Sequence, residues 1–257
     1  MPENADRLCV VLVGARNPLN IGAAARAMSN FGFLRLRVVK PYDVAFREAR
    51  SAVGAAPLLA NAEEHATVAE AVADCMLVVG TTAARHRELH HPLRRLEYGA
   101  RIIRKELARG RVALLFGTEK TGLSNDDLSH CHWLMHIPTR EQHISMNLGQ
   151  AVAVCLYELA RDAKQARASG ANSRARSKAG DKSDEAGDKR ATSGEVERIS
   201  TVLLEALHLS GYVNPIVATS TEERVRRMAR RLNLSSKDAE LWLGMLRQMR
   251  WKIKSEE

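Results

Sequence analysis

The chain has 257 residues, 45% of them hydrophobic, which is enough for one large or two modest domains with a proper core. Lys and Arg number 39 against 30 Asp and Glu, and the net charge of +9 favours a polyanionic partner, although a solvated basic surface would also explain it. No apolar run approaches the ~18 residues of a membrane span, and the polar N-terminus leads directly into a strand pattern. We therefore expect a cytoplasmic protein with no membrane partner.

The cysteines and histidines give no metal-binding pattern. The four cysteines are far apart and no Cys-x-x-Cys pair occurs, so neither a zinc site nor a disulfide framework is expected. His86, His90 and His91 lie close together, but they form no obvious metal-ligand pattern with a carboxylate or cysteine. We interpret this cluster as a polar turn or as a mobile loop that touches a substrate, and we expect no metal.

Apolar strand patterns alternate with helical patterns over the first 160 residues. The expected strands are Leu8–Val13, Leu34–Val39, Met76–Thr82, Val112–Gly117 and Trp133–Ile137. The expected helices are Ile21–Asn30, Val44–Val53, Val68–Ala73, Tyr98–Ala108, a short helix capped by Ser124, and a long apolar helix that Ser145 opens. Because strands and helices alternate, the sequence predicts an α/β fold with a parallel sheet covered on both faces.

The composition changes abruptly after Arg161. Residues 162–194 contain no large apolar residue and therefore predict a flexible, charged linker. Helical periodicity returns at Glu195 and predicts a small helical domain over residues 195–257. The division expected from sequence is therefore an α/β domain over residues 1–161, the linker, and this helical domain.

Two further helices are expected within the last part of the chain, at Thr221–Leu232 and from Ser235 to about Ile253. The second begins with a Ser-x-x-Asp form of the capping box. Between Glu222 and Lys254 there are ten Lys and Arg against four Asp and Glu. A solvated helical face explains this charge about as well as an RNA-docking face does. If this basic tail touches phosphates, deletion of residues 195–257 should weaken RNA binding and leave the ligand pocket of the α/β domain intact.

Three loops at the carboxyl ends of expected strands have unusual compositions. In the first, Asn20 is a candidate helix cap, and Arg26 lies less than two turns into the helix, where an isolated Arg is usually a surface charge. In the second, Gly117 and Gly122 bracket Glu119. This second loop has neither the Gly-Lys-Ser/Thr ending of a Walker loop nor a Gly-x-Gly-x-x-Gly pattern, so nucleotide triphosphate and dinucleotide sites are disfavoured and a plain turn stays open.

The third loop runs from Thr139 to Ile144, between the last strand and the helix headed by Ser145. Strand-to-helix junctions of this kind are where α/β sheets place ligands, although ordinary helix capping would also explain the Ser145 position. No Ser-His-Asp set, Cys-His set or paired carboxylates can be selected by spacing. The residue pattern alone therefore predicts ligand-competent loops without naming a reaction.

Together the three loops resemble motifs one to three of the SPOUT methyltransferases of the TrmH class. The matching segments are Asn20-x-Gly-x-x-x-Arg26, Gly117-x-Glu119-x-x-Gly122-Leu123, and Ile137-Pro with Ser145-x-Asn147-Leu148. The resemblance covers roughly residues 8–160. The run Val-Val-Gly-Thr-Thr-Ala-Ala-Arg from Val78 narrows it to members that methylate nucleotide thirty-two of the tRNA anticodon loop and carry a C-terminal helical extension.

The resemblance implies a C-terminal trefoil knot in the α/β domain, a homodimer, S-adenosylmethionine as cofactor, and methyl transfer to ribose 2′-oxygens of RNA. The residues that it implies for cofactor binding are Thr81, Thr82, Ala83, Gly117, Ile137, Ile144, Ser145 and Met146. As catalytic residues it implies Arg26, which reaches the cofactor held by the other subunit, and Glu119 and Asn147, which orient the loops and Arg26.

A guanidinium stays protonated under ordinary conditions, so we favour a role for Arg26 in gripping the adjacent phosphate and stabilising negative charge on the 2′-oxygen over a role as free base. Two other functions remain alternatives at this point. One is 2′-O-methylation of ribosomal RNA, and the other is RNA binding by a SPOUT protein without catalysis.

Overall fold

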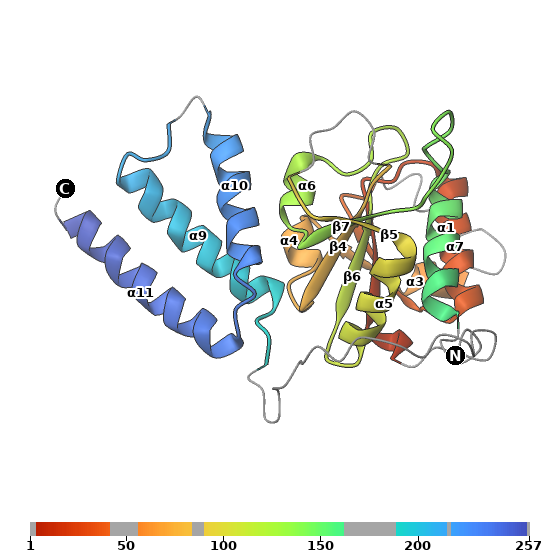
Figure 1. Cartoon of the computed structure of the whole chain (residues 1–257), viewed down its shortest axis with the longest axis horizontal. Coiled ribbons are helices and arrows are strands. Elements are labelled where there is room, and N and C mark those ends of the chain that lie inside the picture. Colours follow the sequence, from red (N-terminus) through yellow and green to blue (C-terminus); the bar gives the residue numbers. More distant parts are fainter. Residues whose placement is uncertain (1–3, 42–55, 84–89, 162–188, 215–216, 256–257) are drawn as a thin grey trace, which may run out of the picture.

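The computed structural model describes residues 4–41, 56–83, 90–161, 189–214 and 217–255. Figure 1 shows a sheet with helices packed on it and, beside it, a group of C-terminal helices. The strands are β1 (Leu8–Val13), β2 (Arg35–Val39), β3 (Glu63–His65), β4 (Leu77–Thr81), β5 (Leu93–Arg95), β6 (Val112–Phe116) and β7 (Trp133–His136). The helices are the 3-10 helix η1 (Ala5–Arg7) and the α-helices α1 (Pro18–Phe31), α3 (Ala56–Ala60), α4 (Val68–Ala71), α5 (Leu96–Leu107), α6 (Asn125–Ser129), α7 (Leu148–Ala160), α9 (Ser193–Leu209), α10 (Ala218–Arg231) and α11 (Ser236–Ser255).

The strands form one sheet in the order β3-β2-β1-β6-β4-β7-β5, and every pair of neighbours is parallel. This confirms the predicted α/β fold with a parallel sheet. The apolar patterns miss the two edge strands, because β3 reads Glu-Glu-His and β5 reads Leu-Arg-Arg, and they miss the short helix α3. The expected helix Val44–Val53 and most of the expected linker over residues 162–194 lie outside the described residues.

Apolar clusters cover both faces of the sheet, as predicted. Side chains that alternate along β1 enter different clusters, with Val10 packed in the cluster of α1, α5 and α7, and Val11 in the cluster of α4 and α6. One buried charge interrupts this pattern. Arg37 of β2 is only 4% exposed and makes a forked pair of hydrogen bonds with Asp74, at 2.6 and 2.9 Å.

Two helix starts differ from the expectation. Asn17, and not Asn20, caps α1, since its side chain accepts a hydrogen bond from the Leu19 backbone N–H at 2.9 Å and Pro18 fits the first helical position. Likewise Asn147, and not Ser145, caps α7, because its Oδ1 accepts from the backbone N–H groups of Gly149 and Gln150. Ser145 and Asn20 are thereby left for other contacts.

The helices α1 and α7 lie against each other, as Figure 1 shows. A Cβ atom added to Gly149 would lie 2.5 Å from the Cβ of Ala23, so this crossing requires the absence of a side chain. The first and third loop motifs are therefore brought together by the packing of the helices that follow them.

The C-terminal helices pack beside the sheet (Figure 1). The helix α9 begins two residues before the expected Glu195, with Thr192 and Glu195 forming a capping box, and the Ser235–Asp238 capping contact of the last helix is present. The chain entering α9 is fixed to the α/β part, because the backbone N–H groups of Ser193 and Gly194 donate to Cys75 and Ala73 at 2.8 and 2.9 Å. No described helix is long and apolar enough to cross a membrane. The trefoil knot stays a prediction.

Candidate functional site

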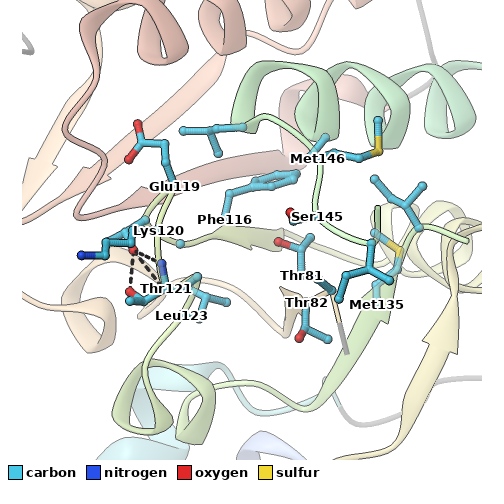
Figure 2. A pocket seen from close by; sticks show the side chains of 18 of the residues that line it. Thr81, Thr82, Phe116, Glu119, Lys120, Thr121, Leu123, Met135, Ser145 and Met146 are labelled. Atoms are coloured by element: carbon cyan, nitrogen blue, oxygen red, sulfur yellow. Dashed lines mark hydrogen bonds between the residues drawn. The ribbon is translucent and has the colours of Figure 1, made fainter. Parts of the chain in front are cut away.

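A pocket of about 360 Å³ opens at the carboxyl ends of β4, β6 and β7, the edge at which parallel sheets place ligands. It is enclosed by the loops over residues 81–83, 117–123 and 137–146 and by the start of α7. Figure 2 shows Thr81, Thr82 and Met135 on one side and Glu119, Lys120 and Thr121 on the other. All eight residues that the resemblance implies for cofactor binding line it, namely Thr81, Thr82, Ala83, Gly117, Ile137, Ile144, Ser145 and Met146.

The loop after β6 is a tight turn that only glycine permits. Thr118 and Gly122 exchange two backbone hydrogen bonds, at 2.9 and 3.2 Å, and Gly122 has a φ of +70°. A Cβ added to Gly117 would overlap the backbone of Gly122 and Leu123. The two glycines therefore fold the loop back on itself at the rim of the pocket.

Hydrogen bonds within the walls fix the other two loops. The Thr81 hydroxyl donates to the backbone carbonyl of Leu115 at 2.8 Å, which ties the end of β4 to β6. The Thr139 hydroxyl donates to the carbonyl of Ile144 at 3.0 Å and closes the third loop. Apolar side chains, including Phe116, Met135 and Leu148, fill much of the remaining wall. Such a lining of apolar area with a few fixed polar groups is typical of sites for small organic ligands.

Three side chains join the three loop motifs. The Asn147 amide Nδ2 donates to Oδ1 of Asn20 at 2.6 Å, and Nδ2 of Asn20 donates to Oε1 of Glu119 at 3.2 Å. The Glu119 carboxylate also accepts from the backbone N–H groups of Asn17 and Arg16, at 3.1 and 3.4 Å. A hydrogen-bonded chain therefore connects the start of α1, the turn after β6 and the cap of α7.

These contacts also decide the charge of Glu119. Partial burial alone would raise the pKa of its carboxyl, but donors from its own backbone, from Asn17 and from the Asn20 side chain outweigh this effect and lower the pKa below its ordinary value. Glu119 is thus an ionised hydrogen-bond acceptor near neutral pH. Its hydrogen bonds connect the turn after β6 to the start of α1.

Arg26 lies apart from the other two residues implied to be catalytic. It is exposed on α1 and does not line the pocket of its own chain, and within the described parts of the chain no hydrogen bond or ion pair to it is present. Glu119 and Asn147 are brought together through Asn20, which the sequence pattern marks only as a candidate cap. The described residues contain no group of three or more His, Cys, Asp or Glu placed to hold a metal.

Residues 7–157 match the SpoU rRNA Methylase family. The chain is 41% identical over 156 residues to the tRNA (cytidine/uridine/adenosine-2′-O-)-methyltransferase TrmJ of Pseudomonas aeruginosa, covering 60% of each chain. It is 38% identical over 159 residues to the tRNA (cytidine-2′-O-)-methyltransferase TrmJ of Methanocaldococcus jannaschii, covering 59% of this chain and 66% of the relative. The matched region thus spans less than two thirds of the length of these curated relatives.

Solved structures share the fold. The crystal structure of TrmJ from Z. mobilis ZM4 has a TM-score of 0.75 at 29% identity, and the match covers 94% of this chain and 98% of that one, so it includes C-terminal helices. A probable methyltransferase from Bordetella pertussis Tohama I has a TM-score of 0.57 at 34% identity, covering 62% of this chain and 98% of that one. From the pocket, the linked motifs and these matches it follows that the chain belongs to the SpoU rRNA Methylase family.

Proposed function

We propose that this protein transfers a methyl group from S-adenosylmethionine to a ribose 2′-oxygen of tRNA, and that the target is nucleotide thirty-two of the anticodon loop. One observation carries the proposal: the second and third loop motifs of the resemblance line a single pocket, and the Glu119, Asn20 and Asn147 side chains join them to the first motif. The names of the TrmJ relatives support tRNA over ribosomal RNA as the substrate.

The pocket suits this cofactor in size and lining. Its volume of about 360 Å³ lies in the range of small-molecule sites, and Met135, Leu148 and Ile137 offer apolar area for a purine ring. Gly117 and Gly122, at the two ends of the folded turn, line the cavity and present only backbone there. We assign cofactor contacts to the eight lining residues named above. Ser145, which directly follows the third loop, is one of them.

When bound, the cofactor supplies an already electrophilic methyl group, so the protein's task is chiefly to align the ribose oxygen and stabilise the charge that develops on it. Arg26 does this through its guanidinium, which binds the adjacent phosphate and stabilises negative charge on the 2′-oxygen. Glu119 and Asn147 do not touch the reacting atoms but hold the loops in place through Asn20.

The position of Arg26 supports a homodimer in which each subunit completes the site of the other. Arg26 does not line its own pocket, and the two helices that follow the first and third motifs carry exposed apolar side chains, Leu19 at 81% and Tyr157 at 55% exposure. Burial of these groups against a second copy would place α1 of one protomer beside its partner. We propose that Arg26 acts in the partner's pocket, and that the dimer works in the cytoplasm.

The test is methyl transfer by the full chain with radiolabelled S-adenosylmethionine, using tRNA and ribosomal RNA isolated from cells that lack the gene. We expect label in tRNA, and mass-spectrometric mapping should place the 2′-O-methyl group at nucleotide thirty-two. Label in ribosomal RNA alone would support the first alternative. Cofactor binding with no label in either RNA would support a binding protein and contradict the proposal.

A further inference from the structure

The C-terminal helix α10 lies beside α6, the short helix that follows the glycine turn of the pocket (Figure 1). Leu123, just before α6, and Leu128, within it, both line the pocket. The cap of α6 is also fixed locally, because Ser124 and Asp127 form a capping box. Any contact that fixes the position of α6 therefore also fixes one wall of the cavity.

Two arginines of α10 make such contacts. Arg226 pairs with the Asp126 carboxylate at 3.1 Å and donates to the Ser129 hydroxyl at 3.0 Å. Arg230 donates from Nε to the His130 backbone carbonyl at 2.9 Å, and its Nη2 lies 3.1 Å from Nδ1 of His130. These bonds join positions about a hundred residues apart, and one of them satisfies the His130 carbonyl at the carboxyl end of α6.

Glu197 of α9 forms ion pairs with both arginines. Its two carboxylate oxygens lie 3.2 Å from Arg226 and 2.8 Å from Arg230. The Arg230 side chain is 1% exposed and that of Glu197 is 22% exposed, so the cluster is shielded from solvent and salt. A buried guanidinium without its carboxylate is strongly unfavourable, so loss of Glu197 should release α10 from α6 rather than leave the charge in place.

We infer that Glu197, Arg226 and Arg230 are positioning residues for the cofactor pocket, because they clamp α6 and with it the wall formed by Leu123 and Leu128. The C-terminal helices are then part of the support of the pocket and not only an appended RNA-binding unit. This runs against the expectation from sequence that deletion of residues 195–257 leaves the pocket intact. The assignment of the pocket to S-adenosylmethionine rests on the proposed function, whereas the clamp itself does not.

The test compares two isosteric variants of the full chain. Glu197→Gln removes the carboxylate of the clamp, while the control Glu205→Gln removes the carboxylate of the Arg250–Glu205 pair, which also joins C-terminal helices but does not touch α6. Amide hydrogen exchange is measured over residues 117–129 without ligand. Binding of S-adenosylhomocysteine is measured by calorimetry at a temperature where each variant is fully folded.

We expect exchange over residues 117–129 to accelerate about tenfold in Glu197→Gln, with a dissociation constant raised roughly five- to tenfold, and no change in Glu205→Gln. Should Glu197→Gln fail to fold, Arg226→Lys replaces it, since lysine keeps the charge but loses the forked contacts at the more exposed end of the cluster. Unchanged exchange and affinity in a folded clamp variant would overturn the inference. A wild-type protein that binds no S-adenosylhomocysteine would refute the proposed function, and the exchange data would still decide the clamp.

Discussion

The side-chain amide of Asn147 donates a 2.6 Å hydrogen bond to Oδ1 of Asn20, a residue 127 positions earlier in the chain. Asn20 passes the connection on by donating to Glu119. The Asn20 amide accepts one hydrogen bond and donates another. A side chain that can only donate or only accept therefore cannot replace it. The Asn20 side chain therefore connects the turn after β6 to the cap of α7.

Asn20→Asp should therefore be more harmful than Asn20→Ala at neutral pH. The aspartate keeps the shape but removes the donor to Glu119 and places a second carboxylate beside it, whereas alanine only removes the bonds. We expect Asn20→Ala to lower the free energy of unfolding by about 1–2 kcal/mol and Asn20→Asp by more. Urea denaturation measures both.

The control for these variants is Asn30→Ala, at the exposed end of the same helix, where a change within about 0.5 kcal/mol is expected. If Asn20→Asp were as stable as the wild type, the hydrogen-bonded chain would have no energetic role.

Two glycine-to-alanine changes should have opposite effects. A Cβ at Gly117 would overlap the backbone of Gly122 and Leu123, so the turn must open and the cofactor pocket must deform. At Gly244 of α11, no atom beyond the neighbouring residues and backbone of the helix itself lies within 4 Å of the added Cβ. We expect Gly117→Ala to lower the free energy of unfolding by about 1–3 kcal/mol and to remove most of the affinity for the cofactor. Gly244→Ala should gain about 0.5–1 kcal/mol because alanine favours the helix.

Thermal unfolding and calorimetric titration with S-adenosylhomocysteine measure the two glycine variants side by side. Equal stability of both would show that the turn tolerates a side chain, contrary to the geometry.

The local pattern predicts the buried strands and the ligand-competent loops at their carboxyl ends, because apolar runs and glycine-bearing strand ends are visible in a few adjacent residues. The eight lining residues follow from the family resemblance and not from this pattern. It does not predict which of two suitable residues caps a helix. Asn17 and Asn20 both fit the start of α1. Asn17 caps the helix, because the Asn20 side chain instead donates to Glu119, which is 99 positions away. The burial of Arg230 likewise depends on His130, a hundred positions earlier. Hydrogen bonds between polar side chains that lie far apart in the chain produce no periodic pattern in the sequence.

Arg26→Ala should bind cofactor as the wild type does and lose methyl transfer. The side chain lies outside the pocket of its own chain, so truncation removes no contact to the cofactor in that chain. Under the proposed function, however, the negative charge on the 2′-oxygen loses its guanidinium partner. Removal of one such charged group typically costs on the order of 10²- to 10³-fold in kcat. A calorimetric titration paired with an activity assay checks this split, and weaker cofactor binding with normal turnover would contradict it.

A mixing experiment tests whether Arg26 serves the partner subunit. Ser145→Trp should fill the pocket and be inactive, while Arg26→Ala has an intact pocket but no guanidinium. After the two are unfolded and refolded together in equal amounts, the mixed dimers contain one complete site, and about a quarter of wild-type activity should return by random pairing. Refolded single variants are the control. If a mixture shown to contain mixed dimers recovers no activity, Arg26 acts in the pocket of its own subunit.

The stability of the protein should fall in acid partly through Glu197. Burial would raise the pKa of this carboxyl, but hydrogen bonding to His130 and the charge of Arg230 lower it to about 2, against an ordinary value of 4.5. A depressed pKa in the folded state means that the ionised group stabilises the fold above about pH 4.5 and that this contribution is lost as the pH falls toward 2. The loss amounts to roughly 3 kcal/mol at most.

Glu197→Gln has no proton to bind in this range, so its melting temperature should fall less than that of the wild type between about pH 5 and pH 3. Glu205→Gln, which alters the Arg250 pair outside the clamp, should keep most of the wild-type pH dependence. Calorimetric melting at several pH values distinguishes the two variants. Parallel curves for Glu197→Gln and the wild type would mean that the carboxylate of Glu197 has the same proton affinity in the folded and unfolded chain, which is incompatible with its contact to Arg230.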